Sequence, residues 1–67
     1  MTIGMRIRYL RRKRFLKQEK LAEKLGCCVA SIRRWENDDG GPNWAWLLKL
    51  AAFFGMTLSE FLEGVKA

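Results

Sequence analysis

The chain has 67 residues, 49% of them hydrophobic, which suffices for one compact domain over residues 1–67 but leaves little room for a catalytic cleft. It contains no histidine and only two cysteines, Cys27 and Cys28, so a zinc site with spaced ligand pairs, histidine-based catalysis and a disulfide scaffold are excluded, and a reducing cytoplasmic compartment is expected. The net charge of +6 divides into +9 over residues 1–35 and −3 over residues 36–67, which favours nucleic acid or another anionic surface as partner.

Apolar residues at helical spacing predict two helices in the first 26 residues. The first runs from Ile3 to near Phe15, and its apolar stripe contains Ile7 and Leu10. The second begins at about Gln18 and stops at Gly26, because glycine readily takes the left-handed conformation that ends a helix. Its inward residues are Leu21, Ala22 and Leu25.

A third helix is predicted after Cys28, which stands at the N-cap position, and it ends at about Asn37. Ile32 and Trp35 supply its inward face. Residues 38–42 combine two aspartates, two glycines and the one proline of the chain, so they are predicted to form a loop.

A fourth helix is predicted between Asn43, a good N-cap, and Gly55. Thr57 and Glu60 have the spacing of a capping box and open a fifth helix. The inward residues are predicted to be Trp44, Leu47, Leu48, Ala51 and Phe54 in the fourth helix and Leu58, Phe61 and Leu62 in the fifth. The fold class is therefore an all-α bundle of five short helices.

Residues 18–37 have the dimensions of a helix-turn-helix, two short helices joined through a glycine turn. Over residues 3–62 the chain resembles the Cro/repressor-like (Xre-type) helix-turn-helix family. The matching residues are Leu10, Arg11, Gln18, Leu21, Ala22, Leu25, Gly26, Ile32, Trp35, Glu36, Pro42, Leu47, Ala51, Gly55 and Leu58. The resemblance implies a lambda-repressor-like DNA-binding domain whose third helix enters the major groove.

Four residues of the third helix point away from its inward face and are expected to read bases: Val29, Ala30, Arg33 and Arg34. An arginine donates two hydrogen bonds to guanine, whereas Val29 and Ala30 can only pack against a thymine methyl group or permit close approach. The resemblance assigns base reading to Val29, Ala30 and Arg34. We therefore expect a DNA site with at least one essential guanine.

Phosphate contacts are expected first at Gln18, in the first turn of the second helix, where free N–H groups and the helix dipole attract anions. The resemblance implies that this glutamine grips a backbone phosphate. Lys17 and Lys20 replace the Ser or Thr and the Glu usual in the family, so a capping box is lost and two cations are gained. Arg12 and Asn37 are further phosphate candidates, and a solvated charged face is the alternative for the basic residues.

Arg11 and Glu36 occupy positions that resemble a structural ion pair between the first helix and the end of the third, so they are assigned to the scaffold. Arg6 and Arg8 are expected to contribute electrostatic field and solubility.

Two features depart from the family pattern. Asp38 and Asp39 would repel phosphate unless they turn outward or pair with a neighbour. Trp46 and Phe53 lie opposite the predicted inward face of the fourth helix, which suggests a surface for a homodimer or another domain. The alternative is that these aromatic side chains pack on the N- or C-terminal tail.

The expected function is a sequence-specific, double-stranded DNA-binding transcriptional regulator: a repressor, not an enzyme, that binds a pseudo-palindromic operator as a homodimer at the nucleoid. The alternative is a protein-interaction or antitoxin-like module that uses the aromatic surface of the fourth helix. No cofactor, metal or small-molecule substrate is expected. A membrane is disfavoured as partner because no apolar run approaches about 20 residues and the first helix lacks interfacial aromatics on its narrow apolar stripe.

Overall fold

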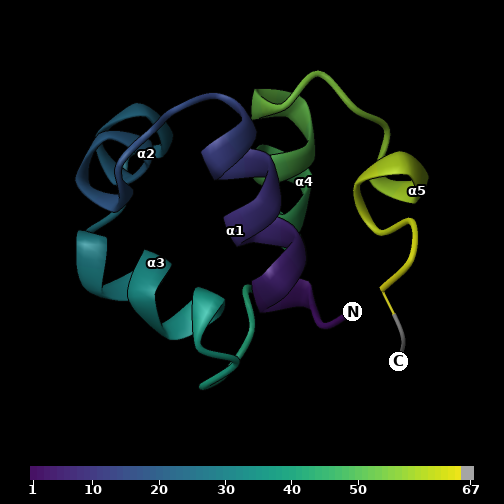
Figure 1. The fold of residues 1–67 in the computed structure, drawn as a ribbon, viewed down its shortest axis with the longest axis horizontal. Coiled ribbons are helices and arrows are strands. Elements are labelled where there is room, and N and C mark those ends of the chain that lie inside the picture. Colours follow the sequence, from purple (N-terminus) through teal and green to yellow (C-terminus); the bar gives the residue numbers. More distant parts are fainter. Residues whose placement is uncertain (66–67) are drawn as a thin grey trace.

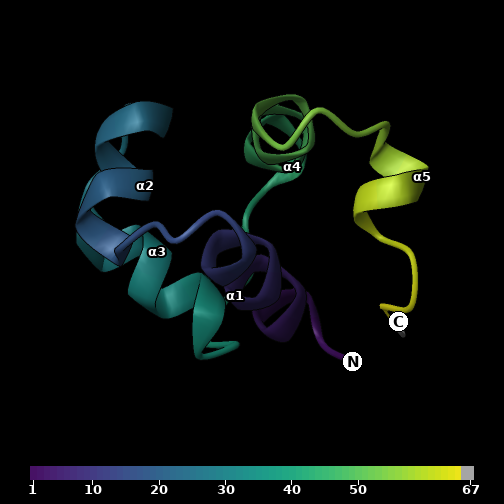
Figure 2. The ribbon, with the colours of Figure 1, turned by 45° about the horizontal axis from the view of Figure 1, so that its top comes forward.

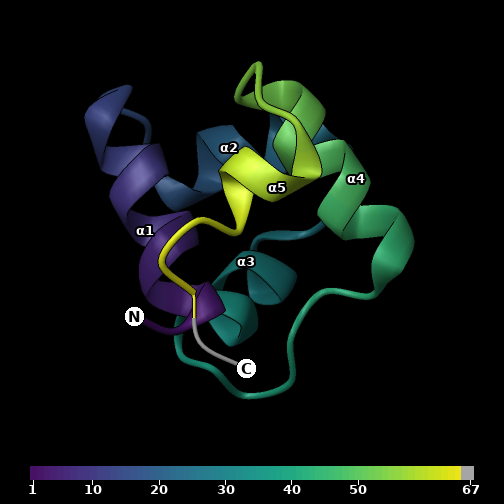
Figure 3. The ribbon, with the colours of Figure 1, turned by 90° about the vertical axis from the view of Figure 1, so that its right-hand side faces the viewer.

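The computed structural model describes residues 1–65, which form five helices and no strand. The helices are α1 (Ile3–Lys13), α2 (Gln18–Leu25), α3 (Val29–Glu36), α4 (Trp44–Phe53) and α5 (Leu58–Phe61). The predicted all-α bundle is confirmed; the domain end expected at residue 67 lies outside the described residues. Figures 1 and 2 show α1 in the middle, with α2 and α3 on one side and α5 on the other. Figure 3 shows α5 in front of the space between α1 and α4.

A residue with positive φ follows each of these helices within three positions. Glycine fills this position after three of them, at Gly26, Gly55 and Gly64, where the left-handed conformation costs least. Phe15 and Asp38, both with a φ of 56°, fill it after α1 and α3. Because Phe15 already takes this conformation, α1 ends at Lys13, slightly before the predicted end.

The core is built around α1 and draws on every helix. Ile7, Leu21, Ile32, Leu50 and Phe61 have no exposed surface. Burying an aliphatic or phenyl side chain of this size stabilises a fold by roughly 1.5–3 kcal/mol. These five side chains, one from each helix, belong to a single hydrophobic cluster that joins all five helices.

The inward face of α4 is rotated from the predicted one. Trp44 is 64% exposed and Leu48 is 45% exposed, so the prediction that they face the core is wrong. Leu50, which the prediction omitted, is completely buried. The physical reason is that α4 is apolar around most of its circumference, so periodicity alone does not select one face.

Trp46 and Phe53 are half-buried against the core. The ring of Trp46 lies 5.7 Å from that of Trp35 in α3, and the ring of Phe53 meets that of Phe54 edge-on at 5.1 Å. Tilted and edge-on pairs at such distances are favourable aromatic geometries. Both side chains thus contact interior aromatic residues. The large apolar side chains that α4 exposes are instead those of Trp44 and Leu48.

Arg6 and Arg14 fasten α1 to the C-terminal ends of α5 and α4. Arg6 donates from Nε to the carbonyl oxygen of Phe61 at 2.8 Å and from Nη2 to that of Glu60 at 2.9 Å. Arg14 donates from Nη2 to the carbonyl oxygen of Phe54 at 3.0 Å. Each arginine places a cation at the negative end of a helix. Beyond the electrostatic field and solubility expected of it, Arg6 therefore has a structural role that the sequence did not indicate.

Gly4 lets α1 cross the end of α3 at close range. Gly4 is buried, and a Cβ atom there would lie 2.7 Å from the carbonyl oxygen of Glu36 and closer still to that of Trp35. Both neighbours are backbone atoms that cannot rotate away. The crossing of α1 and α3 therefore depends on the absence of a side chain at residue 4.

Candidate nucleic-acid interface

α2 and α3 are joined by a tight turn that holds them as one unit. Gly26 takes a φ of 80°, and the N–H of Cys27 donates back to the carbonyl oxygen of Ala22 at 3.0 Å. Ala22 is buried, and its small side chain permits the close crossing of the two helices. This is the helix-turn-helix expected over residues 18–37, and its packing fixes the direction of α3.

The two thiols at this turn have different environments. Burial raises the pKa of Cys27, while a hydrogen bond with the Ser31 hydroxyl, with Sγ and Oγ 3.5 Å apart, lowers the pKa of the exposed Cys28. Both cysteines are free. The turn is therefore held by backbone hydrogen bonds and packing, without a disulfide.

The two helices of this unit begin without a side-chain cap. Thr2, Asn43 and Thr57 each accept a hydrogen bond from a first-turn N–H of α1, α4 and α5, respectively. Lys17 and Cys28, the N-caps of α2 and α3, make no such bond. Unsatisfied N–H groups at the positive end of a helix dipole attract phosphate. The start of α2 therefore differs from the three capped helices in offering amide donors to a ligand, whereas at the start of α3 the Ser31 N–H already donates to the carbonyl oxygen of Cys28 at 3.0 Å.

The outward side of α3 carries the predicted base-reading residues. Ala30, Arg33 and Arg34 are exposed, whereas Val29 is half-buried and packs against the core. Arg33 lies 3.9 Å from a carboxylate oxygen of Glu19 in α2. Within the described chain, Arg34 has no carboxylate within 4.0 Å. Of the two arginines of α3, Arg34 is thus the one whose charge is not offset by an ion pair within residues 1–65.

A buried network links α1, the start of α2 and the end of α3. Arg11 donates from Nε and Nη2 to the two carboxylate oxygens of Glu36, at 2.6 and 3.0 Å, and from Nη1 to the carbonyl oxygen of Leu16 at 2.8 Å. Arg8 and Gln18 donate to Glu36 at 3.3 and 3.1 Å. Burial alone would raise the pKa of Glu36, but these donors lower it below its ordinary value. The carboxylate therefore stays ionised and holds the three helices in register.

Gln18, Lys17 and Lys20 gather at the start of α2, where phosphate contacts were predicted. The Gln18 side chain is half-buried, and its amide nitrogen already donates to Glu36. Lys17 is exposed, and Lys20 lies 3.5 Å from Glu23 one turn along the same helix. An exposed pair of this kind contributes little, so Lys20 remains available to an anion.

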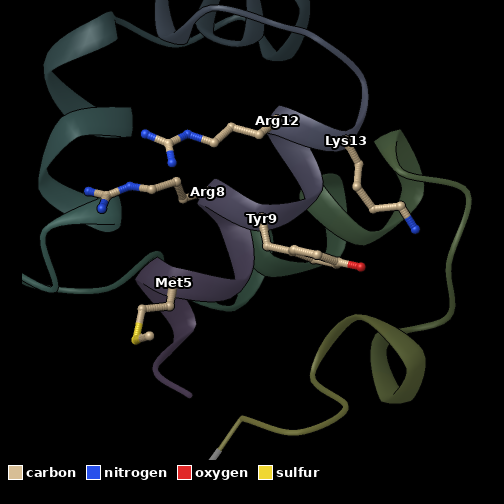
Figure 4. Close-up of a pocket in the computed structure, with 5 residues that line it drawn as sticks. All are labelled: Met5, Arg8, Tyr9, Arg12 and Lys13. Carbon is tan, nitrogen blue, oxygen red and sulfur yellow. The ribbon is translucent and has the colours of Figure 1, made fainter.

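Arg12 and Asn37 flank this region from α1 and from the end of α3. Figure 4 shows Arg8 and Arg12 extending from α1 in the same direction, toward α3, while Tyr9 and Lys13 extend the other way. Arg8 is tied to Glu36 and lies 3.5 Å from the side-chain oxygen of Asn37. Arg8 therefore has a structural role that the sequence reading missed, and Arg12 is the exposed cation beside it.

Asp38 is a second residue whose role the sequence did not reveal. Its carboxylate accepts hydrogen bonds from the Thr2 hydroxyl at 2.7 Å and from the Gly4 N–H at 3.0 Å. The charge thus lies at the positive end of the α1 dipole, where it is stabilising. The sequence left open whether the aspartates of this loop turn outward or pair with a neighbour, and Asp38 pairs with Thr2 and Gly4.

Within residues 1–65, no group of three or more cysteine, aspartate or glutamate residues is arranged to hold a metal ion. None of the helices in this part of the chain has the length and apolar character needed to cross a membrane.

Comparison with known proteins finds relatives that contain a helix-turn-helix. A family model described as a helix-turn-helix domain matches residues 2–63. The HTH-type transcriptional activator BcrR of Enterococcus faecalis is 36% identical over 64 residues, which are 96% of this chain and 31% of that protein. The chain thus spans about a third of the length of this relative.

Two solved structures of the P22 c2 repressor have the same fold. The solution structure of its DNA-binding domain (1–76) gives a TM-score of 0.86 at 30% identity, over 96% of this chain and 84% of that one. The crystal structure of the repressor protein in complex with synthetic operator 9T gives a TM-score of 0.85 at 30% identity, over 96% of this chain and 97% of that one.

Proposed function

The chain belongs to the helix-turn-helix family, and we propose that it is a sequence-specific regulator of transcription that represses by occupying a pseudo-palindromic operator. One observation carries this proposal: α3 buries Ile32 and Trp35 in the core and turns Arg33 and Arg34 outward, beside the uncapped start of α2. Occupying an operator requires no catalytic group. We place this action in the cytoplasm, at the nucleoid, with residues 1–67 acting as one domain.

Base reading is assigned to four residues of α3. Arg34, and with it Arg33, donates to guanine N7 and O6, while Ala30 and Val29 pack against a thymine methyl group or let the helix approach the base edges. Val29 is the first residue of α3 and is half-buried, so we assign it a smaller share of the base contacts than Ala30.

Phosphate binding is assigned to residues around the start of α2 and the end of α3. The α2 amides would hold one phosphate, with Lys17 and Lys20 beside it and the Gln18 side chain oriented by Glu36. Arg12 and Asn37 would contact the neighbouring stretch of backbone. These contacts set affinity and register and carry no sequence information.

Replacing Arg34 with alanine is expected to cost about 1–3 kcal/mol of binding to the preferred site and much less on random DNA. Arg12→Ala, which removes the same charge from the predicted phosphate set, should weaken both duplexes alike and reduce the salt slope by about 1. Fluorescence anisotropy titrations on a site selected from a random pool and on a scrambled duplex measure both effects. Equal losses on the two duplexes for Arg34→Ala would remove it from base reading.

We further propose that the protein binds its operator as a homodimer through the exposed side of α4. Because Trp46 and Phe53 are engaged with core aromatics, the partner surface shifts to the four exposed apolar residues of this helix: Trp44, Ala45, Leu48 and Ala52. They follow one another at helical spacing, and contiguous exposed apolar patches mark association sites.

Exchanging Trp44 and Leu48 for serine should therefore weaken self-association and binding to a two-half-site duplex, while affinity for a single half-site is kept. Sedimentation equilibrium with and without DNA measures the first effect and anisotropy the second. A wild-type protein that stays monomeric on a two-half-site duplex would contradict the dimer. A wild-type protein that does not bind DNA at all is a separate outcome, in which the exposed α4 surface would instead support the protein-interaction module.

A further inference from the structure

Phe15 is unusual among the residues that end the helices of this chain. It has a φ of 56° and its side chain is 95% exposed. Glycine fills the same role after α2 and α4, and Asp38, after α3, uses its carboxylate to bind the start of α1. A bulky side chain in the left-handed region is disfavoured, and an exposed phenyl ring gains nothing from burial. The residue type at position 15 is therefore poorly explained by the fold.

The turn at Phe15 is held by backbone hydrogen bonds and by the Arg11 side chain, which donates to the carbonyl oxygen of Leu16 at 2.8 Å. The N–H of Phe15 donates to the carbonyl oxygen of Arg12 at 3.0 Å, and that of Leu16 donates to the carbonyl oxygen of Arg11 at 3.2 Å. Glycine or asparagine would make the same two bonds with less backbone strain. The phenyl group takes part in none of these bonds and is 95% exposed, which points to a contact outside the described chain.

The surroundings of Phe15 indicate the chemistry of that contact. The ring borders a shallow hollow at the start of α2, lined by Phe15, Leu16, Lys17, Glu19, Lys20 and Glu23. Its two carboxylates each have a cation nearby: Glu19 lies 3.9 Å from Arg33, and Glu23 lies 3.5 Å from Lys20. Lys17 has no carboxylate within 4.0 Å among residues 1–65, and the α2 amides beside it lack a cap. An apolar ring next to donors for an anion matches the alternating sugar and phosphate groups of a nucleic-acid strand.

We propose that Phe15 packs against a deoxyribose of the DNA backbone, next to the phosphate held by the start of α2. This inference rests on the proposed DNA-binding function and adds a residue to it. A phenyl–sugar contact involves no charge and no base edge, so it adds affinity equally on every sequence and releases no counterion. The unfavourable backbone conformation at Phe15 is then maintained for binding and not for folding.

The test is Phe15→Asn, because asparagine tolerates the left-handed conformation without glycine's flexibility. We expect its Tm to equal or exceed that of the wild type by a few degrees. Its affinity for duplexes of any sequence should fall about 3- to 10-fold, as expected for losing part of a phenyl ring's burial, with an unchanged salt slope. Lys17→Ala should instead lower the salt slope by about 1.

Tyr9→Ala is the matched control. Tyr9 is also an exposed aromatic residue, at 47%, but its side chain extends from α1 away from α3, and its loss should leave DNA affinity unchanged. Phe15→Asn that binds DNA as tightly as the wild type would overturn the inference and leave a protein as the partner of Phe15. A clearly lower Tm would overturn it too, since the ring would then serve the fold. A wild-type protein without DNA affinity is a different result, which refutes the proposed function itself.

Discussion

Replacing Gly4 with alanine is expected to destabilise the domain by about 3 kcal/mol or more, at the upper end of overpacking effects. The added methyl group would overlap the backbone carbonyl oxygens of Trp35 and Glu36 and come within 2.7 Å of the Asp38 carboxylate. Relief requires α1 to move away from α3, which also breaks the bond from the Gly4 N–H to Asp38. A core this small supplies roughly 3–5 kcal/mol in total, so most of the variant should be unfolded at 37 °C.

Circular dichroism during thermal and urea unfolding measures this loss, and Gly41→Ala is the matched control. A Cβ atom at Gly41 would lie 3.8 Å from the Ile3 side chain, an ordinary contact, and the backbone there has no positive φ. Gly41→Ala should therefore unfold at the wild-type temperature or slightly above it. A Gly4→Ala variant as stable as Gly41→Ala would show that α1 and α3 do not cross as described.

Exchanging Glu36 for alanine is expected to cost about 3–5 kcal/mol, because it leaves the guanidinium of Arg11 buried without its counterion. Arg11 is 8% exposed and Glu36 3% exposed, so water cannot replace the lost partner. Gln18 would also lose the acceptor that orients it at the start of α2. Stability and DNA affinity should therefore fall together.

Urea unfolding monitored by circular dichroism measures this effect, with Glu23→Ala as the control. Among residues 1–65, Glu23 pairs only with the exposed Lys20, and such a surface pair contributes about 0–1 kcal/mol. A Glu36→Ala variant that loses no more than about 1 kcal/mol of stability would contradict the structural role of the network.

The network also predicts how stability depends on pH. Because the pKa of Glu36 is lower in the folded chain, its contribution is fully present above the pKa of the unfolded chain. It is lost as the pH falls through the folded-state pKa. The Tm of the wild type should therefore drop more on acidification than that of Glu36→Gln, which has no carboxyl group at this position. Equal drops for the two proteins would contradict the lowered pKa.

Local signals in the sequence were sufficient to predict the helices. Gly26 and Gly55 mark helix ends through their positive φ, and Thr57 with Glu60 forms the predicted capping box. The orientation of α4 could not be predicted in this way. Its nearly continuous apolar surface fits several rotations, and the choice depends on Trp35, which receives Trp46 from a helix distant in the sequence.

The outward direction of Arg33 and Arg34 follows from helical geometry once Ile32 and Trp35 face the core, so it could be predicted. The roles of Arg6 and Asp38 could not. Arg6 reaches carbonyl groups 54 and 55 residues further along the chain, and Asp38 reaches back 34 residues to the Gly4 N–H. Such contacts leave no periodic or spacing signal, because they exist only after the helices have packed.

The most direct test of the proposed DNA-binding function is selection of duplexes from a randomised pool by the wild-type protein, followed by sequencing. The proposal predicts enrichment of paired, inverted half-sites about 34 Å apart, each containing a guanine. Enrichment of no sequence, together with no retained DNA at about 50 mM salt, where phosphate contacts are strong, would contradict it.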